Sequence, residues 1–442
     1  MKHPQTFKMT RMLGFPVAAL MSLTLMACGG GGDSAPPVST QPVGTNVTLA
    51  STLSGDQELT PTLTGGVGTG TLTLASPSNA ISGSISINGL TATAAHIHQG
   101  ATGTNGAIIV GLTESAPGSG SWAVPTGATL TQAQADAFVS GGLYFNAHTA
   151  ENTGGEIRGQ IGRDVSTAQL TSAQEVPSNS STATGNGLLS FDPLTKKFSA
   201  RLTLVGLAAT AAHIHNGTVG NNGAILFPLS ETAPGSRIWV SAADTVLTDA
   251  QVVLLNSGSL YFNAHSPALP AGEIRGQIGR NVRVVTMSGD QETIPTGSTA
   301  TGKGTLIVDP ITRAATGSFT ATGMTATDGH IHLGAAGANG PVIYPLTMTS
   351  PNVFTLPAGT SFTAAQLKAF KQGGLYFNAH SAAFPGGEIR GQIREGSALP
   401  VTQPATPPAT QPATQPAMQP PTQPATQPAT QPAIQPAAPV VY

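Results

Sequence analysis

Leu143-Tyr144-Phe145-Asn146-Ala147-His148 is a stretch in which apolar and polar side chains alternate. Alternate side chains of a β-strand lie on one face of its sheet. The stretch therefore predicts a strand with its tyrosine, asparagine and histidine on one side and its apolar side chains on the other. The same six residues return twice, ending at His265 and at His380. The chain thus repeats a strand that has one apolar face and one polar face.

Two further motifs accompany each copy of this strand. A His-Ile-His segment precedes it and begins at His96, His213 and His330, and a Gly-Glu-Ile-Arg-Gly-Gln-Ile segment follows it, first at 155–161. Of the ten histidines in the chain, nine lie in these motifs, and the tenth, His3, lies in a segment that we expect to be removed. Such selective use of histidine needs a local reason, either a ligand site or a fixed polar network.

The motifs recur with a period of 117 residues, as the three His-Ile-His segments show. A period of this length is typical of one domain for each repeat, because compact domains commonly contain about 100–150 residues. We therefore predict three tandem domains, at residues 47–164, 165–281 and 282–395.

Short alternating stretches and frequent turn residues predict an all-β fold. Apolar residues occupy every second position of 81–87, and the chain contains 54 glycines and 35 prolines. We expect each domain to be an antiparallel β-sandwich or β-barrel. One short helix interrupts each domain, because Thr-x-x-Gln sequences beginning at Thr131, Thr248 and Thr363 have the pattern of a helix capping box.

The N-terminal end differs from the repeats. Residues 1–27 combine basic residues with an uncharged apolar run, which is the layout of a secretory signal peptide. They lead into Cys28, the only cysteine of the chain, in a sequence that resembles a bacterial lipoprotein cleavage box. We expect lipid attachment at Cys28 and a flexible linker at 28–46. Because Gly29 follows the cysteine, we expect the protein to be secreted and anchored in the bacterial outer membrane. The alternative is an ordinary cleaved signal peptide with a stray cysteine.

The C-terminal segment 396–442 is rich in Pro, Gln, Thr and Ala and contains no charged side chain, so we expect a disordered tail. Over the whole chain, only 9% of residues are charged, and the formal net charge is −2. Proteins that bind nucleic acid carry basic patches, so this composition argues against such a partner.

The polar faces of the three motifs are expected to meet in each domain. His96 and His98 point the same way from their strand, and alternation likewise places Glu156 and Arg158 on one face. If these strands are neighbours, three imidazoles converge with the third histidine, His148. A His-x-His pair on a strand and one distant histidine can place three nitrogens around zinc or copper.

Two hypotheses about this cluster remain open. In the first, the histidines bind copper or zinc, Asn146 and Glu156 orient their rings, and one position on the ion stays open. In the second, the histidines are hydrogen-bonded to Glu156 and Arg158 and only stabilise the sheet. The presence of the cluster in three copies does not distinguish these hypotheses, because duplication of the domain would repeat a metal site and a structural network alike.

The candidate residues fall into two sets. The candidate metal ligands are His96, His98, His148, His213, His215, His265, His330, His332 and His380. The candidate residues that support them are Asn146, Glu156, Arg158, Asn263, Glu273, Arg275, Asn378, Glu388 and Arg390. Three other acidic residues, Glu58, Glu175 and Glu292, follow a glutamine near the start of each repeat, and we interpret them as turn residues at a strand end.

The order of the motifs resembles the CHRD domain, first named from the developmental protein chordin. The shared features are Gln-Glu near the start, Ala-His-Ile-His-x-Gly, Tyr-Phe-Asn-Ala-His and Gly-Gly-Glu-Ile-Arg-Gly-Gln-Ile, and they cover all three repeats. The pattern departs at Asp328-Gly329, where the other copies have two alanines, and at Ala271, which replaces a glycine. The resemblance implies a secreted or surface-attached β-domain without a settled biochemical activity.

The motifs are also similar in order to copper/zinc superoxide dismutase, another β-sandwich. That resemblance would place His96, His98 and His148 at copper-ligand positions and Arg158 at the position of the anion-guiding arginine. The zinc-site residues, the bridging histidine and the disulfide of that family have no counterpart here. This resemblance therefore implies a copper or zinc site without dismutase activity.

We therefore predict a surface-anchored binding protein without enzymatic activity, with a three-histidine copper or zinc site in each domain. Its partners would be the membrane, through the lipid on Cys28, and an extracellular protein or small ligand. One alternative is a redox enzyme similar to superoxide dismutase. The other is a structural or adhesive spacer in which the His, Glu and Arg network binds nothing.

Overall fold

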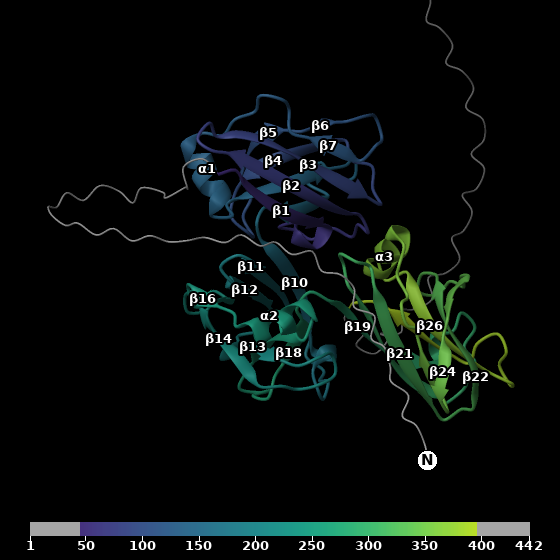
Figure 1. Ribbon diagram of the computed structural model, residues 1–442. Helices are drawn as coiled ribbons and strands as arrows, with labels where there is room; N and C mark the ends of the chain where they lie inside the picture. The colour runs from purple at the N-terminus through teal and green to yellow at the C-terminus, as the bar shows by residue number, and fades with distance from the viewer. Residues whose placement is uncertain (1–44, 396–442) are drawn as a thin grey trace, which may run out of the picture. The chain divides into compact units, whose positions relative to one another are not determined.

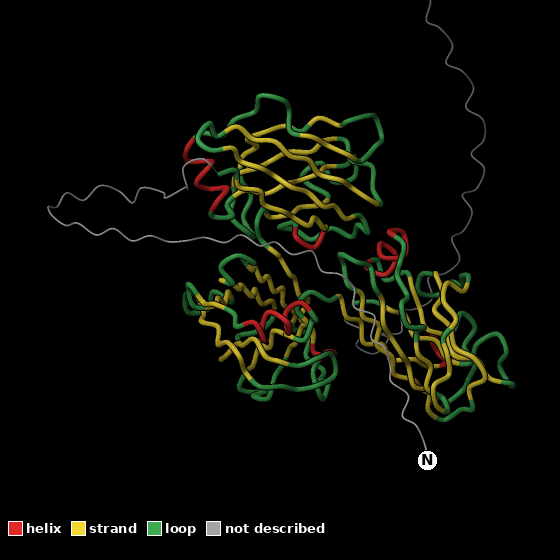
Figure 2. The backbone as a smooth tube through the Cα atoms, viewed as in Figure 1, coloured by secondary structure: helices red, strands yellow, loops and turns green. Residues whose placement is uncertain are grey.

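The computed structural model describes residues 45–395. One compact unit holds the first repeat, and a second unit holds the second and third repeats. The expected signal peptide at 1–27, the lipid site at Cys28 and the tail at 396–442 lie outside the described residues, as does all but the end of the linker. Strands dominate each repeat, with one short α-helix in each (Figure 2).

The first domain contains nine strands, one short 3-10 helix and one α-helix. In chain order they are β1 (Val47–Ser54), η1 (Gly55–Gln57), β2 (Val67–Ala75), β3 (Ala80–Asn88), β4 (Ala94–Gln99), β5 (Ala107–Gly111), β6 (Thr113–Glu114), β7 (Ser121–Ala123), α1 (Gln132–Val139), β8 (Leu143–His148) and β9 (Ile157–Gln160). Figure 1 labels β1 to β7 and α1, and it shows α1 beside the ends of the strands.

The strands of the first domain form a closed antiparallel barrel. Their hydrogen-bonded order is β5-β4-β8-β9-β1-β2-β3-β7-β6. The two ends of this order are joined along the chain, because only Leu112 separates β5 from β6, and its backbone N–H donates to the Ala95 carbonyl. Closure leaves few unpaired strand edges, which are otherwise sites of aggregation.

The second and third domains repeat this arrangement. The second contains β10 (Asp164–Thr171), η2 (Ser172–Gln174), β11 (Thr184–Phe191), β12 (Lys197–Val205), β13 (Ala211–Asn216), β14 (Ile225–Glu231), β15 (Ile238–Ser241), β16 (Thr245–Val246), α2 (Asp249–Asn256), β17 (Leu260–His265) and β18 (Ile274–Gln277). The third contains β19 (Asn281–Ser288), η3 (Gly289–Gln291), β20 (Thr301–Val308), β21 (Ala315–Thr322), β22 (Ala326–Leu333), β23 (Val342–Pro345), β24 (Thr347–Ser350), β25 (Val353–Thr355), α3 (Ala364–Lys371), β26 (Leu375–Ser381) and β27 (Ile389–Ile393). In the second domain the barrel closes directly, because β14 pairs with β15 and β11 pairs with β12. The all-β prediction of three tandem domains with one short helix each is confirmed.

The predicted capping boxes form at the start of all three helices. The hydroxyl of Thr131 accepts from the Gln134 N–H, and the Gln134 side chain accepts from the Thr131 N–H. Thr248 and Thr363 make the same pair of bonds in their helices. Each helix therefore has two N-terminal amide hydrogens satisfied, and it delivers the chain into the Leu-Tyr-Phe-Asn-Ala-His strand. No helix among residues 45–395 is long and apolar enough to cross a bilayer.

Strand β8 and its counterparts β17 and β26 are buried almost throughout their length. All six residues of β8 are buried, not only the apolar three. Leu143, Phe145 and Ala147 are fully enclosed in the barrel interior with the other apolar side chains of the domain. The polar face of β8 points outward from the barrel and is nevertheless covered, so a second structural layer must lie on it.

We expect Gly70→Ala to destabilise the first domain by about 1–3 kcal/mol, because overpacking of a tight core has a cost of this size. A β-carbon at Gly70 would lie 2.6 Å from Ile85 and 3.0 Å from the Phe145 ring, whereas one at Gly111 would meet nothing within 4 Å. Gly111→Ala is therefore the control, with a change within about 0.5 kcal/mol.

Urea unfolding followed by tryptophan fluorescence measures this effect. The chain contains two tryptophans, one in each of the first two domains, so a Trp239→Phe background leaves Trp122 as the reporter of the first domain. Equal unfolding midpoints for the two glycine variants would contradict the predicted packing of Phe145.

Candidate functional site

The three sequence motifs lie side by side in the barrel wall. Strand β4 pairs with β8, which places His96 opposite Asn146 and His98 opposite Tyr144. Strand β8 pairs in turn with β9, which places Asn146 opposite Arg158. Since alternate residues share a face, the outward polar side chains of three neighbouring strands form one cluster. The predicted convergence of the motifs is therefore present.

The three histidines of the first domain form a compact triad. One ring nitrogen from each of His96, His98 and His148 lies within 4.8 Å of the other two. The shortest separation is 2.9 Å, between His96 Nδ1 and His148 Nε2. The ring centroids are 4.8 Å apart for His96 and His148, and 5.8 Å apart for His96 and His98.

Backbone carbonyls orient two of the three rings. His98 Nδ1 lies 3.0 Å from the Gly106 carbonyl oxygen, and His148 Nδ1 lies 3.0 Å from that of Thr153. A carbonyl only accepts, so each Nδ1 carries the hydrogen and each Nε2 keeps a lone pair. We expected Asn146 and Glu156 to orient the rings. Carbonyls do so instead, because the loops after β4 and β8 fold back over the polar face.

The second nitrogen of His98 is buried without a partner. His98 is 8% exposed, and its Nε2 has no hydrogen-bond partner among residues 45–395. Most buried polar atoms in proteins are hydrogen-bonded, so an orphan of this kind needs an explanation. Burial lowers the pKa of His98 and of His96, so both rings are neutral at pH 7. Neutral imidazole is the form that binds a metal ion.

An arginine–tyrosine–histidine stack supports the triad. The Tyr144 ring stacks on His98, with centroids 4.8 Å apart and an interplanar angle of 14°. The Arg158 guanidinium carbon lies 3.6 Å from the centroid of the same tyrosine ring. The Tyr144 hydroxyl accepts from the Gly106 N–H, so the stack also holds the residue that orients His98.

Arg158 fastens the loop after β4 to the barrel. Its two terminal nitrogens donate to the carbonyls of Thr104 and Ala101, at 2.8 and 3.0 Å. The side chain of Gln160 donates to the carbonyls of Gly100 and Gly141. Arg158 is 2% exposed. Its donors are turned to backbone oxygens rather than to solvent, so it has no open face with which to guide an anion.

Glu156 lies apart from the histidines. Its carboxylate accepts from the Thr149 hydroxyl and from the Asn152 side chain, both at 2.6 Å. These bonds close the loop between β8 and β9. We predicted the face of Glu156 from strand alternation, but β9 begins only at Ile157. Glu156 therefore lies in the loop before the strand, and its carboxylate is bonded to the loop residues Thr149 and Asn152.

A glutamate that we interpreted as a turn residue belongs to the cluster. Glu58 follows η1, as a strand-end turn residue would, yet it interacts with Asn146 and Arg158. Burial raises its pKa to about 7 against the attraction of Arg158. The equivalent Glu175 is 7% exposed, and burial raises its pKa to about 7 as well. The sequence did contain one indication that this glutamate matters, because the Gln-Glu pair is repeated in all three domains.

The second domain shows how this glutamate is bound. The Asn263 side-chain N–H donates to Glu175 Oε2 at 3.3 Å, while Glu175 Oε1 and Asn263 Oδ1 are both buried without a partner among the described residues. Two acceptor oxygens in one pair are satisfied together if the carboxyl carries a proton and donates it to the amide oxygen. The neutral carboxylic acid therefore fits this environment.

The other two domains reproduce the triad. His213 Nδ1 lies 3.1 Å from His265 Nε2, and His330 Nδ1 lies 3.1 Å from His380 Nε2. The carbonyls that orient the remaining rings belong to Gly223 and Pro270 in the second domain and to Gly340 and Pro385 in the third. In both domains the Nε2 atom equivalent to that of His98 is also buried and unpartnered, and an arginine again stacks on the tyrosine.

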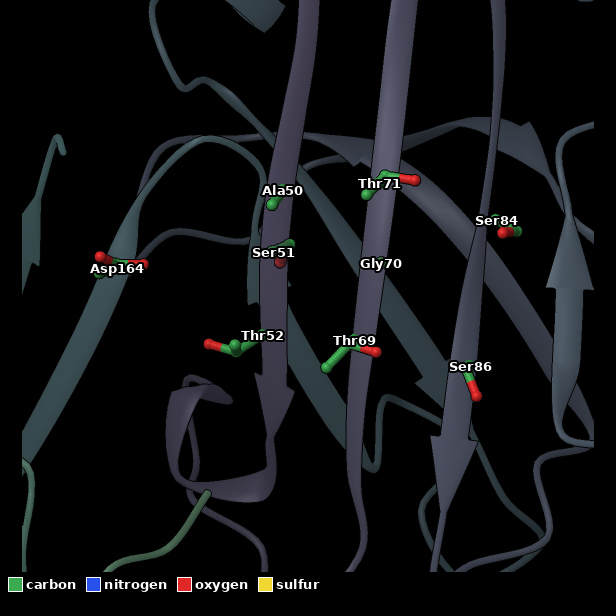
Figure 3. A pocket seen from close by; sticks show the side chains of 9 residues that line it. All are labelled: Ala50, Ser51, Thr52, Thr69, Gly70, Thr71, Ser84, Ser86 and Asp164. Atoms are coloured by element: carbon green, nitrogen blue, oxygen red, sulfur yellow. The ribbon is translucent and has the colours of Figure 1, made fainter. Parts of the chain in front are cut away.

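A shallow pocket of about 360 Å³ lies on another part of the first domain (Figure 3). Hydroxyl side chains of β1, β2 and β3 line it together with Asp164. Its residues are not repeated, because Asn186 and Leu188 stand where the first domain has Thr69 and Thr71. The histidine triad is therefore the better candidate for a site common to all domains.

Comparison with known proteins gives one match. The family model described as CHRD domain matches residues 49–161, 166–278 and 283–393. No curated protein and no solved structure matches the chain.

The raised pKa of Glu175 predicts a pH dependence of stability. Between pH 4.5 and about 7 the Glu175 carboxyl is protonated in the native state and ionised in the unfolded chain. The contribution of Glu175 to the free energy of unfolding therefore falls as pH rises through this window. Above about pH 7 this contribution is constant. The loss is about 3 kcal/mol, from about 1.4 kcal/mol for each pH unit.

Glu175→Gln tests this dependence, since the amide can make both bonds with Asn263 and does not titrate. The lowered pKa values of the histidines act in the opposite sense, so the measured quantity is the difference between wild type and variant. In a Trp122→Phe background, Trp239 reports the unfolding of the second domain. A difference that stays constant from pH 4.5 to 8 would contradict the prediction.

Proposed function

The chain belongs to the CHRD-domain family, and from that premise we propose that it is a non-enzymatic binding protein in which each domain binds one copper or zinc ion through its three histidines. In the first domain the ligands would be His96 Nδ1, His98 Nε2 and His148 Nε2. The ligands of the other domains would be the equivalent atoms of His213, His215 and His265, and of His330, His332 and His380.

The unpartnered Nε2 of His98 and of its two counterparts carries this proposal. A purely structural network would be expected to satisfy a nitrogen that is this deeply buried. Here the opposite nitrogen of the ring is fixed by a carbonyl, and the unpartnered one belongs to a group of three imidazole nitrogens. Metal-bound histidines commonly donate their other N–H to a carbonyl or carboxylate in this way.

The spacing and chemistry of the triad suit a transition metal. Imidazole nitrogen binds zinc at about 2.0–2.1 Å, so two such nitrogens on one ion lie about 3–4 Å apart. The separation of 2.9 Å between His96 and His148 is close to this range, and the third ligand nitrogen lies within 4.8 Å of both. A set of three imidazole nitrogens favours zinc or copper over calcium or magnesium, which prefer oxygen ligands.

Three protein ligands leave one position on the ion for water, a small ligand or a side chain of a partner protein. The closed environment of Arg158 gives no support to a dismutase, because its guanidinium is occupied by the Thr104 and Ala101 carbonyls. A binding role at the cell surface is therefore preferred to redox catalysis. The partner would be an extracellular protein or a small ligand.

We further propose that lipid on Cys28 holds the three domains at the bacterial cell envelope, in the outer membrane. The support is sequence alone: an apolar leader, a single cysteine at its end, and Gly29 after it.

The metal proposal predicts three ions for each full chain. After incubation with zinc or copper and removal of free ions, elemental analysis should give up to three, and His96→Ala with His98→Ala should lower the number by one. Changing the three His-x-His pairs together should lower it to zero, because each triad then keeps a single histidine.

Gln99→Ala is the matched control, since Gln99 is an exposed neighbour of His98 on β4. It should retain the wild-type number of ions, and far-ultraviolet circular dichroism should confirm that each variant is folded, because the third domain contains no tryptophan. A wild-type chain that stays metal-free with both ions, or a triple-pair variant that still binds three, would overturn the proposal.

The anchoring proposal predicts that Cys28→Ser moves the protein from the membrane fraction to the soluble fraction of cells. Metabolic labelling with a radioactive or clickable fatty acid should mark the wild type and not the variant. Labelling of the serine variant, or its retention in the outer membrane, would be inconsistent with a lipid on Cys28.

A further inference from the structure

The three triads are not chemically equivalent, because within residues 45–395 the third alone has a carboxylate in contact with its first histidine. Asp328 Oδ2 lies 3.2 Å from His330 Nε2. The same carboxylate accepts from the Gly329 N–H at 2.9 Å, which fixes its orientation. Ala94 and Ala211 occupy the equivalent positions in the other domains, so their first histidine has no such partner.

The tautomer of the first histidine matters for binding an ion. In the first domain the His148 Nδ1 hydrogen is given to a carbonyl, so His148 Nε2 is an acceptor and His96 Nδ1 must donate to it across 2.9 Å. A metal that uses both nitrogens has to break this hydrogen bond and displace the hydrogen from His96 Nδ1 to Nε2. Part of the binding free energy is lost in that rearrangement.

Asp328 favours the opposite tautomer in the third domain. A carboxylate accepts only, so it binds the hydrogen on His330 Nε2 and leaves a lone pair on Nδ1. His380 Nδ1 faces the Pro385 carbonyl at 3.1 Å, so His380 Nε2 also carries a lone pair. Two lone pairs then face one another across 3.1 Å, an arrangement that a cation between them relieves.

We propose that Asp328 is a positioning residue that prepares the third triad for a metal ion, so that this domain binds zinc more tightly than the other two. The proposal rests on the proposed function of the triads. It assigns the chain one high-affinity site and two weaker ones instead of three equal sites. Partners in the outer coordination of a metal typically change affinity by about 10–100-fold, so we expect at least a tenfold difference.

The test uses full chains in which a single triad remains, the other two being removed by His→Ala changes in their His-x-His pairs. Zinc affinity is measured by competition with a chelator of known dissociation constant. The chain that keeps the third triad should bind at least tenfold more tightly than the chain that keeps the first. Asp328→Ala should remove the difference, and Ala94→Asp should strengthen the first triad.

A second measurement does not depend on metal. Nitrogen-15 chemical shifts of the histidine rings report which nitrogen carries the hydrogen in the metal-free chain. His330 should carry it on Nε2 and His96 on Nδ1, and Asp328→Ala should return His330 to the Nδ1 form. A change that only loosened the fold would not exchange one tautomer for the other.

The outcomes separate the two proposals. If all three triads bind zinc equally and Asp328→Ala has no effect on affinity or tautomer, the role of Asp328 is overturned while the metal sites stand. If no triad binds zinc or copper, the proposed function fails, and the affinity difference fails with it.

Discussion

The burial of β8 on both of its faces is the constraint on which the rest of each domain depends. Its inward face fills the barrel with Phe145 and its neighbours, and its outward face carries Tyr144, Asn146 and His148 beneath a loop. Polar side chains enclosed in this way must be hydrogen-bonded, because burial without a partner is costly. The carbonyls of the loop supply most of the partners, so loop, stack and triad are held as one layer. Among the described residues, the Nε2 atoms of His98 and of its two counterparts remain without a partner in this layer.

The electrostatics of this layer favour neutral groups around one buried cation. Arg158 is held by carbonyl oxygens and by the face of Tyr144, so its charge is distributed over dipoles rather than cancelled by an ionised carboxylate. Burial lowers the pKa of His98 and raises that of Glu58 to about 7, so both groups are less often charged than their exposed forms. Each domain thus brings three imidazole rings together on one side of the layer and places a carboxyl with a raised pKa on another.

Three copies of one layer preserve its distances while its surroundings diverge. The separation between the first and third histidine of a triad is 2.9 to 3.1 Å in all three domains. In the third domain Gly329 stands where the others have alanine, and a β-carbon there would lie 2.7 Å from Phe319 and 2.8 Å from Phe354. Asp328 stands next to this glycine. Two neighbouring differences thus distinguish the third domain: a glycine that faces the barrel interior and an aspartate that adds a charge beside the triad.

Alternation predicted the strands of the repeated motifs and the all-β class, and the Thr-x-x-Gln pattern predicted the helix caps, because both depend on neighbouring residues in the chain. The same alternation predicted that His96, His98 and His148 share one surface if their strands are neighbours, and the pairing of β4 with β8 supplies that condition. Only the tertiary structure decided which groups orient their rings, since the carbonyls of Gly106 and Thr153 have no signature in the sequence. It also moved Glu156 out of the cluster and brought Glu58 into it. Contacts of that kind depend on how loops fold across the sheet, and a local pattern does not encode them.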